Sequence, residues 1–139
     1  PGQVVLSGAP NDLREVRSEA RADGLRAIPL NVSGAFRSSQ MAAAVEPFRT
    51  AVAAVQLNPP RADVFSCATA RPFADPVNEL ADALVSPVRW RETMSAVAAA
   101  GARAYVDVGP GTVLAKLAPR CVADAQVLSL HGAALRLAA

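Results

Sequence analysis

Ala104-Tyr105-Val106-Asp107-Val108-Gly109-Pro110-Gly111 is the stretch that decides the fold class. Its first five residues include β-branched and aromatic types, which predict a strand. Gly109-Pro110-Gly111 predicts a tight turn, followed by a short helix to about Ala118. A second strand is expected at Gln126–Ser129. Strand, helix and strand in this order are typical of an α/β fold with parallel strands.

The alternation of strands and helices continues towards the N-terminus. Short apolar runs predict strands at 3–7, 27–32 and 64–67. Helical spacing and capping residues predict helices at 10–24, 41–55 and 75–84, and a fourth from Ser86-Pro87 to Gly101. Pro47 is expected to kink its helix or to start the second part of it.

The composition limits the classes of protein to which the chain can belong. Its 139 residues are 52% hydrophobic, which is enough for one globular domain. The net charge of +2 comes from scattered arginines and a single lysine, so we expect no nucleic-acid partner. No apolar run approaches the length of about 20 residues that a membrane span needs. Pro1-Gly2-Gln3 resembles neither a start nor a signal peptide, which predicts a chain cut from something longer.

Few residues stand out as candidates for chemistry on their own. Cys67 and Cys121 lack metal-ligand spacing, so we expect no metal and two reduced core thiols in a cytoplasmic protein. His131, the only histidine, is expected to be a surface or capping residue. Asp107 fits either a catalytic carboxylate at a strand end or a buried helix cap. The glycine turn after it fits either a phosphate cradle or a plain tight turn.

Four stretches resemble one family in order and spacing: Pro1–Gly8, Pro29–Met41, Ser86–Trp90 and Val108–Leu114. The family is that of the malonyl-CoA:acyl carrier protein acyltransferases, which includes the acyltransferase domains of polyketide and fatty acid synthases. The resemblance covers only the C-terminal half of the family's domain. It implies that 1–32 are part of a ferredoxin-like small subdomain and that 33–139 are the C-terminal part of a large hydrolase-like subdomain with a parallel sheet.

The resemblance also implies partners and missing parts. The family's partners are malonyl-CoA and acyl carrier protein, and no cofactor or metal is implied. The family's N-terminal half carries the GHSxG nucleophile, a Gln-rich oxyanion segment and an arginine for the malonyl carboxylate, and no GxSxG occurs in this chain. We therefore expect an N-terminal half as a further partner, and open sheet edges and uncovered apolar faces without it.

The position of the family's catalytic histidine holds Arg37. That histidine takes the proton of the nucleophilic serine, which a permanently protonated guanidinium cannot do. Two interpretations of Arg37 stay open: a solvated arginine in a decayed pocket, or a cation facing an acidic thioester or a phosphopantetheine phosphate. Two further departures are Ala83, where the family usually has Gln, and Cys67, where many relatives have Asn.

Phe36 and Ser38 flank Arg37 and are the expected substrate-binding positions. In the family, the residue before the histidine helps to select the acyl group, and Phe is typical of malonyl-selecting members; a plain core aromatic is the alternative. The resemblance thus implies the C-terminal portion of a malonyl-CoA:acyl carrier protein transacylase, inactive as this chain. The alternative is a non-catalytic acyltransferase-like module that docks on a carrier protein or a synthase partner.

Overall fold

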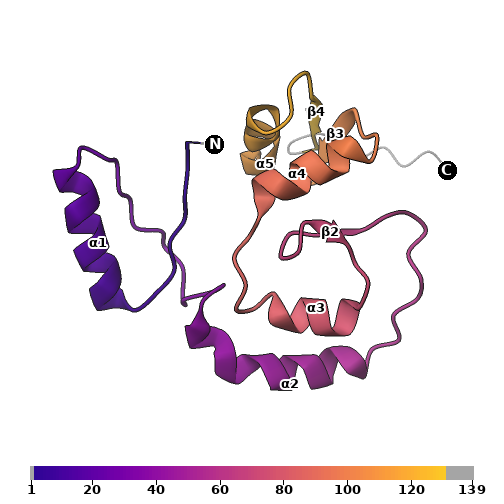
Figure 1. Cartoon of the computed structure of the whole chain (residues 1–139), viewed down its shortest axis with the longest axis horizontal. Coiled ribbons are helices and arrows are strands. Elements are labelled where there is room, and N and C mark those ends of the chain that lie inside the picture. The colour runs from indigo at the N-terminus through magenta and orange to yellow at the C-terminus, as the bar shows by residue number, and fades with distance from the viewer. Residues whose placement is uncertain (1, 131–139) are drawn as a thin grey trace. The chain divides into compact units, whose positions relative to one another are not determined.

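The structure is a computed structural model that describes residues 2–130. The chain divides into two compact units, each containing segments distant in sequence (Figure 1). One unit comprises Gly2–Val64 and Phe73–Val88, and the other comprises Phe65–Pro72 and the described residues from Arg89 onward. The secondary structure is mixed, with helices, one parallel and one antiparallel strand pair, and this confirms the α/β class.

The first unit is helical, and its sequence explains where the helices begin and end. Helix α1 spans Pro10–Ala22, with Pro10 in the first turn, where its missing N–H costs nothing. The chain leaves it through Gly24, whose φ of +76° is a left-handed conformation that glycine adopts easily. The predicted helix and its glycine stop are thereby confirmed.

Helices α2 (Ala42–Ala53) and α3 (Pro76–Asp82) pack against each other within this unit. A short 3₁₀ turn, η1 (Ser39–Met41), leads into α2, and Pro47 lies inside α2. Ala81 of α3 is completely buried. Helix α3 starts as predicted, because the Asp75 side chain accepts a hydrogen bond from the Asn78 amide and so caps the helix.

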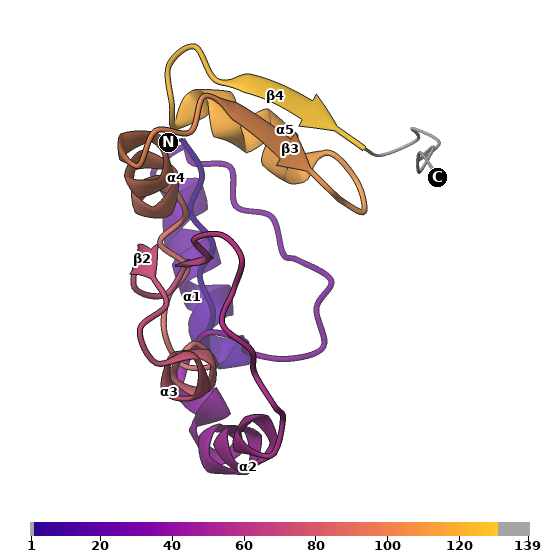
Figure 2. The ribbon, with the colours of Figure 1, turned by 90° about the vertical axis from the view of Figure 1, so that its right-hand side faces the viewer.

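The second unit contains both strand pairs. Strands β1 (Phe65–Ser66) and β2 (Arg71–Pro72) form an antiparallel hairpin. Helix α4 spans Trp90–Ala99. Strand β3 (Ala104–Asp107) pairs in parallel with β4 (Gln126–Ser129), with Tyr105 opposite Val127. Helix α5 (Val113–Leu117) and the 3₁₀ turn η2 (Ala118–Arg120) connect them, as Figure 2 shows.

The parallel unit predicted from residues 104–129 is therefore confirmed. The expected strands at 3–7 and 27–32 are wrong, because both segments run without strand pairing. A strand is stabilised by hydrogen bonds to a neighbouring strand, and neither segment has one among the described residues. Their β-branched residues remain exposed instead, with Val4 84% and Val32 62% accessible.

The expected helix start at Ser86-Pro87 is also wrong, since α4 begins only at Trp90. The Ser86 hydroxyl donates instead to the Asp82 carbonyl at 2.7 Å, at the end of α3. Arg89 is drawn to the β1–β2 hairpin, where its amide donates to the Cys67 carbonyl at 2.8 Å and its Nη1 to the Thr69 carbonyl at 3.0 Å. These contacts keep the segment before Trp90 out of the helix.

Apolar surface is left uncovered in both units. The expectation of accessible apolar residues is confirmed for five side chains, in the first segment, before β1 and in or after β3, all of which are exposed: Val4, Leu6, Val64, Val106 and Val108. Phe65 is half-buried. The described buried apolar residues are few and small apart from Met94. Among residues 2–130, no helix is both long and apolar enough to cross a bilayer.

Candidate functional site

The loop before α2 carries the three predicted site residues, Phe36, Arg37 and Ser38. Phe36 is half exposed, with 50% of its surface accessible. Its ring folds back over Gly34, where an added Cβ would lie 3.6 Å from the ring. Phe36 is thus neither a core residue nor fully extended into solvent.

Arg37 is fixed to the end of α3 by two hydrogen bonds. Its backbone N–H donates to the Leu84 carbonyl at 3.1 Å, and its Nη1 donates to the Ala83 carbonyl at 2.7 Å. Its φ of +63° is left-handed, an uncommon conformation for a residue with a side chain and one that is concentrated at functional sites. The guanidinium is therefore positioned by the fold, although its remaining surface is exposed.

The Ser38 hydroxyl is used locally. It donates to the Ala35 carbonyl at 2.6 Å and accepts from the Gln40 amide at 3.3 Å, which caps the turn η1. These two contacts stabilise the loop that holds Arg37. Phe36, Arg37 and Ser38 lie together only because they are neighbours in sequence. The one segment from outside this loop that contacts Arg37 through the hydrogen bonds above is the end of α3, with the carbonyls of Ala83 and Leu84.

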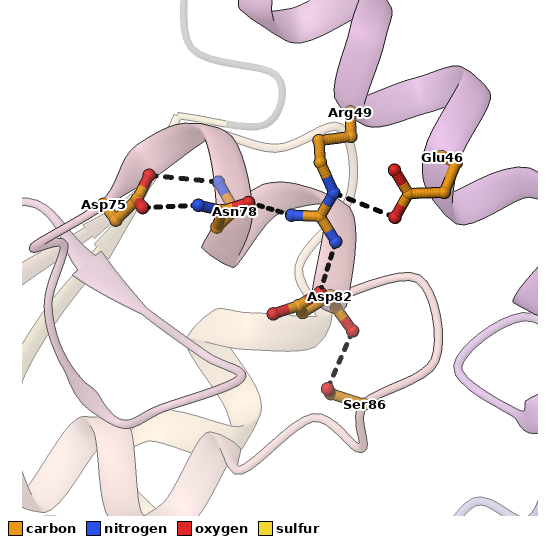
Figure 3. A network of polar contacts seen from close by, with 6 residues as sticks. All are labelled: Glu46, Arg49, Asp75, Asn78, Asp82 and Ser86. Carbon is orange, nitrogen blue, oxygen red and sulfur yellow. Dashed lines mark hydrogen bonds and ion pairs between the residues drawn. The ribbon is translucent and has the colours of Figure 1, made fainter.

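A polar network centred on Arg49 joins α2 to α3 (Figure 3). Arg49 pairs with Glu46 on its own helix at 3.1 Å and with Asp82 of α3 at 2.9 Å. It also donates to the Asn78 side chain, which in turn donates to Asp75 at 2.6 Å. Ala83, whose carbonyl accepts from Arg37, directly follows Asp82 of this network.

Two pKa values are shifted by this network. Hydrogen bonds to Asp82 and Glu46 raise the pKa of Arg49 above its ordinary value. Hydrogen bonds from the Asn78 side chain and amide lower the pKa of Asp75. Both shifts favour the charged forms, so the network is held in place as a set of ions and their donors.

Acid is expected to remove the contribution of Asp75 to stability. Its pKa in the folded chain lies below the ordinary value of 3.8, so the contribution is complete above that value and is lost as the pH falls through the folded pKa. The Asp75→Ala variant should therefore be less stable than the parent chain at pH 7. In urea unfolding, the difference should shrink as the pH falls below the ordinary pKa of 3.8 and through the lower folded pKa. A difference in stability that is the same at neutral and at acid pH would contradict this account. The control is Asp75→Ser, which keeps a capping oxygen without a charge.

The glycine turn after β3 is organised by Asp107, which is only 8% exposed. Its two carboxylate oxygens accept hydrogen bonds from the amides of Gly109 at 3.0 Å and Ala115 at 2.9 Å. Of the two alternatives for Asp107, the structure supports the helix cap. Two amides around the turn are thereby already paired with a side chain of the same chain, which favours the plain tight turn over an anion cradle.

The two cysteines remain unpaired in the described part of the chain. Cys67 and Cys121 are free thiols that are half-buried. Among residues 2–130, no group of His, Cys, Asp and Glu side chains has the arrangement of a metal site. His131 lies outside the described residues.

The chain belongs to the acyl transferase domain family, whose profile matches residues 1–134. It is 33% identical over 132 residues to the polyketide biosynthesis malonyl CoA-acyl carrier protein transacylase PksC of Bacillus subtilis, covering 92% of this chain and 46% of that protein. It is 38% identical over 127 residues to the malonyl CoA-acyl carrier protein transacylase of Synechocystis sp., covering 89% of this chain and 43% of that protein.

Solved structures are similar over the same stretch. The acyl-carrier-protein S-malonyltransferase of Burkholderia pseudomallei superposes with a TM-score of 0.81 at 29% identity, over 88% of this chain and 41% of that one. The acyltransferase domain of an iterative polyketide synthase in enediyne biosynthesis gives 0.77 at 38% identity, over 92% of this chain and 34% of that one. The chain spans less than half the length of these relatives and matches their C-terminal part.

Sequence reasoning missed the Arg49 network and the role of the Leu84 carbonyl. The spacing of Glu46 and Arg49 signals only their local pair. The contact with Asp82 depends on how α2 and α3 pack, and no local pattern reveals that packing.

Proposed function

We propose that this chain is the C-terminal portion of a malonyl-CoA:acyl carrier protein transacylase. In such an enzyme, an acyl group passes from CoA to a serine and then to the carrier-protein phosphopantetheine. The names of the relatives, at 33% and 38% identity, support malonyl-CoA and acyl carrier protein as the partners. We assign 1–32 to the small ferredoxin-like subdomain and 33–139 to the large hydrolase-like subdomain.

One observation carries the proposal for the site: Arg37 donates to the Ala83 carbonyl at 2.7 Å. A backbone carbonyl that accepts from an imidazole N–H fixes the tautomer and leaves the other ring nitrogen free as a base. In this chain a guanidinium uses the same kind of acceptor. Because it has only donors, it cannot accept the proton of a nucleophile. Phe36 and Ser38 are proposed to flank the acyl group.

The 139-residue chain is therefore expected to show no acyl-transfer activity. After incubation with malonyl-CoA, intact-mass spectrometry should find no covalent malonyl adduct, because the chain carries neither a nucleophile elbow nor a base. The full-length Synechocystis relative, treated in the same way, is the positive control. A stoichiometric adduct on Ser38 or Ser39 would overturn the proposal.

A second candidate function is a non-catalytic module that docks on a carrier protein or a synthase partner. The same arginine favours it, since the residue is well positioned but chemically unsuited to the role of base. The two functions differ in one result. A catalytic segment becomes active when a base is supplied at position 37 and the rest of the domain is added, whereas a docking module binds its partner and remains silent.

A further inference from the structure

The last turn of α3 supplies the acceptors for residue 37. The Ala83 amide donates back into the helix, to the Glu79 carbonyl at 3.0 Å. A helix leaves its last carbonyls without partners in the helix itself, and here those of Ala83 and Leu84 accept from Arg37. The orientation of residue 37 therefore depends on where this turn lies relative to the start of α2.

Few apolar side chains are buried between α2 and α3. Within the described residues of this unit, Ala81 is the one apolar side chain that is buried. Leu80 of α3 and Phe48 of α2 keep 36% and 40% of their surface accessible. The hydrophobic free energy scales with the apolar area removed from water, so a buried alanine contributes little. Polar contacts between the two helices therefore carry a large share of their attachment.

Arg49 makes these polar contacts (Figure 3). Its Nη2 donates to Asp82 at 2.9 Å, and its Nη1 donates to the Asn78 side chain. Asn78 and Asp82 are four residues apart, so they lie on one face of α3. The bond from Nε to Glu46, at 3.1 Å, stays within α2. One guanidinium thus contacts α3 at two points one turn apart, and its planar fork fixes the geometry of both contacts.

Asp82 links the Arg49 contact to the acceptors of residue 37. It is the last residue of α3, and its own carbonyl accepts from the Ser86 hydroxyl at 2.7 Å. Ala83 follows it with helical dihedrals, φ of −61° and ψ of −21°. A displacement of Asp82 therefore moves the Ala83 carbonyl as well, because this part of the backbone continues the helix.

We propose that Arg49 is a positioning residue for position 37. Through Asp82 it fixes the last turn of α3, and the carbonyls of that turn orient the side chain at position 37. Arg49 takes no part in the chemistry, because its three nitrogens are used by Glu46, Asn78 and Asp82. The effect on catalysis rests on the proposed function, in which position 37 is that of the general base. The effect on orientation does not.

Hydrogen exchange of the Arg37 amide in the 139-residue chain tests the orientation without any acyl transfer. Arg49→Gln and Asp82→Ala should each lower the protection of this amide roughly fivefold, while the amides of α1 keep theirs. The double variant should lose no more than either single variant, because both remove the same interaction. Arg49→Lys keeps the charge without the fork and should lie between the parent and Arg49→Gln. It also replaces Arg49→Gln in the comparison if that variant fails to fold.

Glu46→Ala is the matched control for these variants. It removes the contact within α2 and leaves both contacts with α3, so the protection of the Arg37 amide should stay within about twofold of the parent. Unchanged protection in both Arg49→Gln and Asp82→Ala would overturn the proposal. An equal loss at Arg37 and throughout α1 would also overturn it, because it would show a general loss of stability.

The rate of transfer separates this proposal from the proposed function. It is measured on the Arg37→His chain joined to the part of the Synechocystis transacylase that this chain does not match. There, Arg49→Gln should lower kcat about tenfold and leave KM within about twofold, because a misplaced base slows the chemical step rather than binding. Transfer that is unaffected by Arg49→Gln would overturn the positioning role. No transfer in any variant, together with selective loss of protection at position 37, would refute the transacylase and support the positioning contact.

Discussion

Arg37→His is expected to restore transacylation once the rest of the domain is present. The rest can be supplied by the part of the Synechocystis transacylase that this chain does not match, joined to or mixed with the 139 residues. General acid–base catalysis contributes roughly 10²- to 10⁴-fold to such reactions, so the His form should exceed the Arg form by that factor. The measurement is the rate of malonyl transfer from malonyl-CoA to acyl carrier protein.

The local structure favours this substitution. The backbone hydrogen bond from residue 37 to the Leu84 carbonyl does not depend on the side chain, and the φ of +63° is more common for His than for most residues. The Ala83 carbonyl, freed from the guanidinium, becomes available to a ring N–H. Arg37→Gln is the matched control, because it removes the charge without adding a base. A completed domain in which the Arg form is as fast as the His form would refute the general-base mechanism.

Asp107→Ala is expected to destabilise the fold strongly, because Asp107 organises the glycine turn between β3 and α5. The carboxylate is buried and accepts two backbone N–H groups, from Gly109 and Ala115. Charge-assisted hydrogen bonds contribute about 1.5–3 kcal/mol each, so loss of both should lower the free energy of unfolding by about 3–6 kcal/mol. Chemical unfolding of the chain, alone or in the completed domain, measures the change.

Two variants serve as controls for Asp107. Asp107→Asn keeps one acceptor oxygen and should lose about half as much. Asp63→Ala removes the carboxylate of an exposed residue in the loop before β1, and it should change the free energy of unfolding by less than about 0.5 kcal/mol. Equal losses for Asp107→Ala and Asp63→Ala would mean that the buried carboxylate does not organise the turn.

The sequence predicted those elements whose stabilising partners lie nearby in the chain. Residues 104–129 contain both strands of a parallel pair and the helix between them, and the structure has them as expected. The spacing of apolar residues and the glycine that follows them were likewise sufficient to predict helix α1. The segments 3–7 and 27–32 have the same β-branched composition, yet no strand among the described residues pairs with them. Composition reports a preference for strand, and pairing decides whether one forms.

The candidate site was predicted only through the resemblance. Arg37 belongs to no motif that composition or spacing reveals, and only alignment with the family's histidine gives it meaning. Its contact with the Ala83 carbonyl joins residues 46 positions apart, and it depends on the packing of α2 on α3. The Arg49 network fixes that packing through side chains of two helices. Contacts of this kind become visible only in three dimensions.

A titration of the exposed apolar surface with the missing part of the domain tests whether this chain is part of a larger acyltransferase domain. We expect the 139-residue chain to bind the dye ANS and to self-associate in light scattering, because residues such as Val4, Val106 and Val108 are exposed. Addition of the N-terminal part of the Synechocystis relative should abolish ANS binding at a one-to-one ratio. A monodisperse, ANS-silent monomer with a sharp cooperative melt would show a self-sufficient domain and contradict this assignment.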